Sequence, residues 1–172
     1  MSSLNGALEF YESPLSLNLR QPMSVSVNLM WNSGLKFEAQ FDDRKIQLNS
    51  ADQMGSAFTP MELFLVSLAG CTAMDVQWIL ERERQKVEYF KITAKGKRRE
   101  EDPQSYESIQ LEYVIRGENV RKDAVERAIR LSQEKYCSVR AMVKDSVKLS
   151  ITFRISDGNK PEEGFEFKTS IS

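Results

Sequence analysis

One segment constrains the fold of this chain more than any other: residues 59–80 are strongly apolar and carry Cys71 at their centre. The segment reads TPMELFLVSLAGCTAMDVQWIL, and Asp75 and Gln77 interrupt it towards its end. Its uninterrupted apolar part is shorter than the roughly 20 residues that a membrane-spanning helix needs, so we predict no membrane span. The segment is also too apolar for a helix at the surface. We therefore expect a central helix that protein covers on most sides, in part through a second copy of the chain.

Length, composition and charge are typical of a globular protein without a nucleic-acid partner. The chain has 172 residues, of which 41% are hydrophobic and 28% charged, enough for one core. A net charge of −1 lacks the basic surplus that phosphate binding requires. The first residues do not have the pattern of a secretory signal, so we expect a cytoplasmic protein. We predict an N-terminal segment over 1–22, a single domain over 23–156 and a poorly ordered polar tail over 157–172.

Hydrophobic periodicity predicts an α+β fold with mostly antiparallel sheets. A half-buried strand is expected over 23–31, where apolar residues alternate with polar ones. The residues on its apolar face are Val25, Val27, Leu29 and Trp31. Further strands are expected over 35–41, 44–49, 87–97, 108–116 and 147–155. The first three strands should form an antiparallel meander.

Two helices have recognisable starts. Thr59, Pro60 and Glu62 have the spacing of an N-cap, a first-turn proline and a capping-box carboxylate. A second, amphipathic helix is expected over 120–135, with Asn119 as its cap, followed by a helical turn over 138–144.

Cys71 and Cys137 are the only cysteines, and the chain contains no histidine. The absence of histidine excludes Cys–His proteases, Ser–His–Asp triads and histidine-ligated zinc sites. We expect neither a metal nor another cofactor. Two alternatives remain for the thiols: redox chemistry, which is the usual role of paired cysteines in the cytosol, or burial without a function.

A helical-wheel projection places bulky side chains and one carboxylate on the same face of the helix as Cys71. At 100° per residue, the side chains on its face are Phe64, Leu68, Asp75 and Trp78. The apolar members, Phe64, Leu68 and Trp78, are candidate pocket residues. Glu62 rotates to the opposite face, which favours a capping role over one beside the thiol.

A reactive thiolate at Cys71 needs a nearby cation, because a thiol has an ordinary pKa of about 8.5 and burial raises it. Without histidine, that cation must be arginine or lysine, from another element or another subunit. Arg44, the arginine of the N-terminal meander, and Arg140, just after Cys137, are the two candidates. A solvent-exposed hairpin position is the alternative for Arg44.

The string TPMELFLVSLAGCTAMD, followed downstream by S-x-x-x-Y-C-S-V around Cys137, resembles the OsmC/Ohr family of osmotically inducible and organic-hydroperoxide-resistance proteins. The resemblance covers roughly residues 24–155. It implies an intertwined homodimer in which two sheets wrap around paired central helices, with active sites at the subunit interface. It also implies a thiol peroxidase: Cys71 becomes a sulfenic acid, Cys137 resolves it as a disulfide, and a dithiol, in some relatives a lipoyl group, reduces that disulfide.

One position departs from the family pattern. The peroxidases have a glutamate directly after the helix-start proline, and this chain has Met61 there. The sequence therefore leaves two main functions open: a peroxidase for organic hydroperoxides, favoured by the apolar residues near Cys71, and a dimer without peroxidase activity that acts as a thiol sensor or a small-molecule binding protein.

Overall fold

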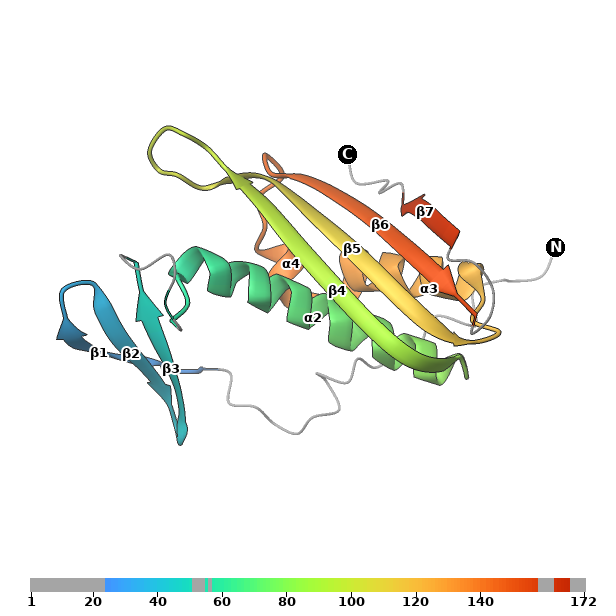
Figure 1. Cartoon of the computed structure of the whole chain (residues 1–172), viewed down its shortest axis with the longest axis horizontal. Coiled ribbons are helices and arrows are strands. Elements are labelled where there is room, and N and C mark those ends of the chain that lie inside the picture. Colours follow the sequence, from blue (N-terminus) through green and yellow to red (C-terminus); the bar gives the residue numbers. More distant parts are fainter. Residues whose placement is uncertain (1–23, 51–54, 56, 158–162, 168–172) are drawn as a thin grey trace.

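The computed structural model describes residues 24–50, 55, 57–157 and 163–167, and within them it contains two sheets and a long central helix (Figure 1). The first sheet has the order β1-β2-β3 and the second has the order β4-β5-β6-β7. Helix α2 extends from the first sheet along the second, where α3 packs beside it. The predicted α+β class, with sheets against a central apolar helix, is confirmed, and all strand pairs except β5–β6 are antiparallel as expected.

The first sheet is the predicted meander. Strands β1 (Asn28–Ser33), β2 (Lys36–Phe41) and β3 (Arg44–Asn49) pair antiparallel in chain order. Gly34 and Asp42 have positive φ in the two tight turns between them. The first strand begins later than expected and is exposed along its whole length, because nothing in the described part of the chain covers it. Residue 23, where the predicted strand began, lies outside the described residues.

Helix α2 (Pro60–Arg82) starts as the sequence predicts. The Thr59 hydroxyl accepts the Glu62 N–H at 3.2 Å, and the Glu62 carboxylate accepts the Thr59 N–H at 2.7 Å. The helix is long and apolar enough to cross a membrane by length and composition. However, its buried side chains include the polar Thr72 and Asp75, so this face belongs to the core of a folded protein.

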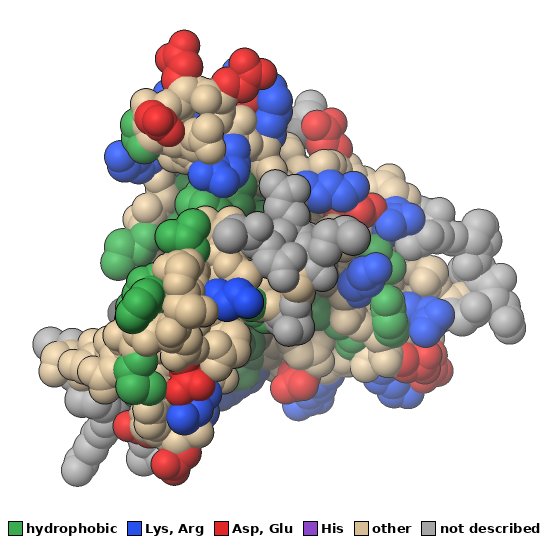
Figure 2. Space-filling model, turned by 60° about the vertical axis from the view of Figure 1, so that its left-hand side comes forward, with side chains coloured by type: hydrophobic (Ala, Val, Ile, Leu, Met, Phe, Trp, Pro, Cys, Tyr) green, Lys and Arg blue, Asp and Glu red, His purple; other side chains and the backbone are tan. Residues whose placement is uncertain are grey.

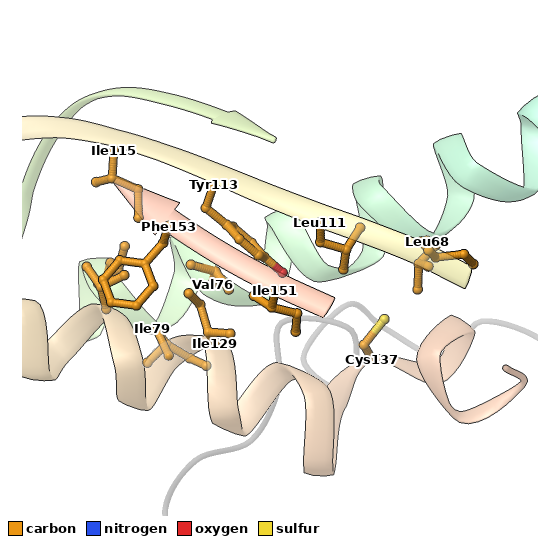
Figure 3. Close-up of a cluster of buried hydrophobic side chains, with 14 of the residues drawn as sticks. Leu68, Val76, Ile79, Leu111, Tyr113, Ile115, Ile129, Cys137, Ile151 and Phe153 are labelled. Carbon is orange, nitrogen blue, oxygen red and sulfur yellow. The ribbon is translucent and has the colours of Figure 1, made fainter. Parts of the chain in front are cut away.

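The second sheet is mixed. Strands β4 (Lys86–Arg98) and β5 (Tyr106–Glu118) form an antiparallel hairpin, but β5 and β6 (Lys148–Ser156) run parallel. A parallel pair needs a crossover connection, and α3 (Lys122–Leu131) supplies it. The core lies between this sheet and the helices. Figure 3 shows side chains from β5, β6, α2 and α3 meeting in this layer, among them Tyr113, Phe153, Val76 and Ile129, all fully buried.

The second helix differs from the prediction at both ends. Asn119 is not its cap: this residue has a positive φ of 54° in the turn after β5, and α3 begins three residues later, after Arg121. The Arg121 N–H donates to the Gln85 side chain, which places the helix start against the end of α2. The helix then widens into a π-helical turn, η1 (Ser132–Tyr136), before the short helix α4 (Ser138–Ala141).

The expectation that the tail after Asp157 is poorly ordered is wrong for residues 163–167. These residues form β7 (Glu163–Phe167), which pairs antiparallel with β6. Phe165 stacks on Phe153 with ring centroids 5.1 Å apart, and the Lys122 ammonium lies 4.1 Å from the Phe165 ring. Composition pointed to a polar tail, but two phenylalanines in alternation were enough to extend the sheet.

Candidate active site

Cys71 and Cys137 come together from distant parts of the chain. Cys71 lies at mid-length of α2 and is partly exposed, whereas Cys137 lies between η1 and α4 and is buried. Both are free thiols. Their sulfurs and a carboxylate oxygen of Asp75 all lie within 4.8 Å of one another. Figure 3 shows Cys137 near Ile151 and Leu111, at the edge of the buried cluster.

The π-helical turn and α4 hold Cys137 in place. Its N–H donates to the Ser132 carbonyl at 2.9 Å, and its sulfur accepts the Arg140 N–H at 3.3 Å. Burial, followed by a hydrogen bond with Cys71, raises the pKa of the Cys137 thiol to about 12. Cys137 is therefore protonated at neutral pH, and its sulfur is a weak nucleophile there unless a base removes the proton.

A buried polar network lies behind the thiols. The Thr72 hydroxyl lies 2.7 Å from the Tyr113 hydroxyl and 2.8 Å from the Ser132 hydroxyl, and it accepts the Gln133 amide at 2.9 Å. Ser132 donates to Asp75 Oδ2 at 3.1 Å. Burial raises the pKa of Asp75 and the bond from Ser132 partly opposes that rise, while burial also raises the pKa of Tyr113 well above its usual value.

Sequence reasoning placed Asp75 on the Cys71 face, but it missed the network. Thr72 was the available signal, because it is a polar residue next to Cys71 in an otherwise apolar helix. Its partners come from β5 and η1, and nothing in their local sequence identifies them.

The two candidate cations differ in position. Arg44 is on the exposed β2–β3 turn, 3.9 Å from Asp42 and over the Phe41 ring. Arg140 lies in α4, three residues after Cys137, and donates from Nη1 to the Val143 carbonyl. Its Nε is buried and has no hydrogen-bond partner among the described residues.

The three predicted pocket residues lie in different surroundings. Phe64 lines an open cleft of about 520 Å³ between the start of α2, the β4–β5 loop and the segment after α4. Leu68 is fully buried in the core. Trp78 lies farther along α2, where its ring makes an edge contact with Tyr136.

Met61, for which the resemblance noted in the sequence leads us to expect glutamate, also lines this cleft. Its carbonyl accepts the Tyr106 hydroxyl at 2.8 Å, and Tyr106 packs on Phe64 with ring centroids 6.0 Å apart. The start of α2 therefore offers an apolar wall here instead of a carboxylate.

Two thiols and a carboxylate form a possible metal donor set, since zinc accepts cysteine and aspartate ligands. The raised pKa of Cys137 opposes the deprotonation that metal binding by this thiol requires.

Comparison with known proteins shows which family the chain is similar to. The family model for OsmC-like proteins matches residues 53–152. Protein YhfA of Escherichia coli K12 is 32% identical over 131 residues, which are 76% of this chain and 98% of YhfA. A hypothetical protein from Aquifex aeolicus has a solved structure with a TM-score of 0.72 at 39% identity, covering 79% of this chain and 98% of that one.

A more distant structure shares the fold alone. The organic hydroperoxide resistance protein OhrB of Bacillus subtilis has a TM-score of 0.54 at 10% identity, covering 74% of this chain and 97% of that one. The match to the family model spans more than half of the chain. YhfA is more than 30% identical to this chain over three quarters of its length. The chain therefore belongs to the OsmC-like protein family.

Proposed function

We propose that this protein is a cysteine peroxidase that reduces organic hydroperoxides. The observation that carries the proposal is the meeting of Cys71 and Cys137, whose sulfurs lie within 4.8 Å at one end of the buried core. Membership of the OsmC-like family fits a redox role for this pair. The difference in burial supports a division of roles, with the more accessible Cys71 reacting with peroxide and the buried Cys137 resolving the product.

The proposed reaction has three steps. The Cys71 thiolate attacks the distal oxygen of R–O–OH, the O–O bond breaks, and R–O⁻ takes a proton to leave as an alcohol while Cys71 becomes a sulfenic acid. Cys137 then displaces hydroxide from that sulfur, which gives the Cys71–Cys137 disulfide and water. A dithiol reductant, of which a lipoyl group is one example, exchanges with the disulfide and restores both thiols.

The apolar part of the cleft at the start of α2 supports an organic substrate. Met61, Phe64 and Val143 contribute to a lining that also contains charged residues, and these apolar side chains gain from burying an alkyl group but not from binding hydrogen peroxide. We expect a faster second-order rate of Cys71 oxidation with cumene hydroperoxide than with hydrogen peroxide. Equal rates would contradict this substrate preference.

We propose that the working unit is a cytoplasmic homodimer without a membrane or nucleic-acid partner. Val66 and Met74 are large apolar residues of α2 that are more than half exposed in one protomer, as are Leu29 and Trp31 of β1. Figure 2 views the molecule from the side of the first sheet and shows hydrophobic side chains on that surface. Within one protomer Arg140 is the better placed cation, and Arg44 would act only across a subunit interface.

A thiol titration tests the proposal. One equivalent of cumene hydroperoxide should remove both thiols of the reduced protein and leave a Cys71–Cys137 disulfide on mass mapping. Cys71→Ser should abolish peroxide consumption. Cys137→Ser should consume one equivalent and stop at the sulfenic acid. Two thiols that persist in the wild-type protein would overturn the proposal.

Met61 favours a second candidate, a dimer without peroxidase activity that binds a small molecule or acts as a thiol sensor. Replacing a carboxylate by an apolar side chain beside an open cleft suits ligand binding better than activation of a thiolate. Under this alternative, Cys71→Ser should bind an apolar fluorescent probe as well as the wild-type protein does, and neither should consume peroxide.

A further inference from the structure

Forming the disulfide requires Cys137 to lose a proton. Burial raises the pKa of this thiol to about 12, so the thiol is protonated at neutral pH. The chain has no histidine that could accept the proton. Proton removal therefore limits the attack of Cys137 on an oxidised Cys71 unless a base lies beside it.

Asp75 is in the position of such a base. A carboxylate oxygen lies within 4.8 Å of both sulfurs, and the side chain is fully buried. Asp75 Oδ1 has no hydrogen-bond partner among the described residues. Catalytic contacts are commonly longer in the resting protein than in the reacting complex, so this spacing is compatible with proton transfer.

The hydroxyl network fixes which oxygen of Asp75 is free for a proton. Ser132 has one proton and gives it to Asp75 Oδ2, so Ser132 must accept from Thr72. Thr72 has then used its own proton and must accept from both Tyr113 and Gln133. Every donor in the network thus points towards Oδ2, and a proton arriving on the carboxylate goes to Oδ1.

We propose that Asp75 is the general base that takes the Cys137 proton as the Cys71–Cys137 disulfide forms. The inference rests on the proposed dithiol chemistry and adds a residue to it. The Asp75 carboxylate takes the S–H proton, the Cys137 sulfur bonds to the Cys71 sulfur, and the S–O bond of the sulfenic acid breaks. The leaving hydroxide takes the proton from Asp75 and departs as water, which restores the carboxylate.

A chromogenic aromatic disulfide isolates this step from peroxide chemistry. Cys71 attacks the reagent and releases one coloured thiolate, and Cys137 then attacks the mixed disulfide and releases a second. We expect Asp75→Asn to retain the first phase and to slow the second by about 100-fold or more. Asp145→Asn, the same change at an exposed turn, should leave both phases unchanged.

The pH profile separates a base from a structural role. Groups that interact electrostatically with Asp75 are Tyr113, Cys137 and Tyr136, and Cys71 also faces it. In the wild-type protein the second phase should accelerate through the Asp75 pKa and level off, whereas in Asp75→Asn it should keep rising towards the thiol pKa. Ser132→Ala removes the hydrogen bond that lowers the Asp75 pKa, so the pH midpoint of the second phase should move to higher pH in this variant. Ser132→Ala provides the test of the proposal if Asp75→Asn fails to fold.

The outcomes separate the two proposals. A second phase in Asp75→Asn as fast as in the wild-type protein, or a Ser132→Ala midpoint that does not move, would overturn the role of Asp75. A wild-type protein that closes the disulfide with the aromatic reagent and keeps both thiols in hydroperoxide would overturn the peroxidase and leave the role of Asp75 supported.

Discussion

Thr72 is the residue at which the polar groups behind the thiols meet. One hydroxyl serves Tyr113, Ser132 and Gln133, all buried, in a helix whose other buried side chains are mostly apolar. Buried polar groups cost most when a partner is removed, because their desolvation then has no compensation. This makes Thr72 important for stability as well as for the position of Asp75.

Replacing Thr72 by valine should test this cost. The side chain keeps its shape, but three buried groups lose a partner, so we expect the free energy of unfolding to fall by about 1–3 kcal/mol. Urea denaturation measures it. Thr152→Val on β6, a half-buried threonine, should stay within about 0.5 kcal/mol of the wild-type protein. Equal stability of Thr72→Val and wild type would mean that the network is not maintained in solution.

The Cys137 thiol should make the reduced protein sensitive to alkali. Its pKa in the folded state is raised from 9.0 to about 12, so the unfolded chain loses this proton first as pH rises. The contribution is fully present below the unfolded pKa and is lost as pH rises from about 9 towards about 12. We expect the urea midpoint of the wild-type protein to fall more steeply between pH 8 and about 10 than that of Cys137→Ala. Parallel slopes would contradict a raised pKa.

At the scale of elements, the junction of α3, η1 and α4 determines the site. The π-helical turn places Ser132 and Gln133 against α2 and ends where Cys137 begins. Single π-helical turns inside helices often occur at functional sites. Strand β7 has a different role: it covers the outer edge of β6, and thereby protects the strand that would otherwise end the sheet.

Phe165→Ala should show that β7 contributes to stability. The substitution removes the stacking on Phe153 and the contact with the Lys122 ammonium, so we expect a loss of about 1–2 kcal/mol in thermal or urea unfolding. Glu166→Ala, at the neighbouring exposed position, is the matched control and should have little effect. If both variants unfold like the wild-type protein, β7 does not support the sheet.

At the scale of the whole molecule, one protomer leaves part of its most apolar helix uncovered. The buried face of α2 packs under the second sheet, while Val66 and Met74 are exposed. A second copy that covers this face would remove apolar surface from water and complete the burial that the sequence predicts for the helix.

Met74→Glu should therefore weaken the proposed dimer. Light scattering of the wild-type protein should give twice the chain mass of 19.8 kDa, and the variant should shift towards 19.8 kDa because a charge would be buried at the interface. Tyr89→Glu, at an exposed position of β4, should leave the mass unchanged. A monomeric wild-type protein would exclude this arrangement.

Local patterns in the sequence predicted most of the elements. The capping box of Thr59 and Glu62 and the alternation along residues 148–156 depend on neighbours a few positions away, so they are readable without a fold. The prediction of Asn119 as the helix cap was wrong because asparagine also suits a left-handed turn. The hydrogen bond from the Arg121 N–H to Gln85 decides where α3 begins. The prediction missed β7 because the polar composition of the tail outweighed the alternation of its two phenylalanines.

By itself, the sequence determined which groups are available for the proposed chemistry: two thiols, no histidine, and a carboxylate one turn after the first cysteine. Only the tertiary structure decided how they act together. Asp75 meets Ser132 across 57 positions and Thr72 meets Tyr113 across 41, and these contacts set the protonation of the buried groups. Burial and hydrogen bonding of a side chain depend on what the fold packs against it, and that information is not carried by the residues next to it in the chain.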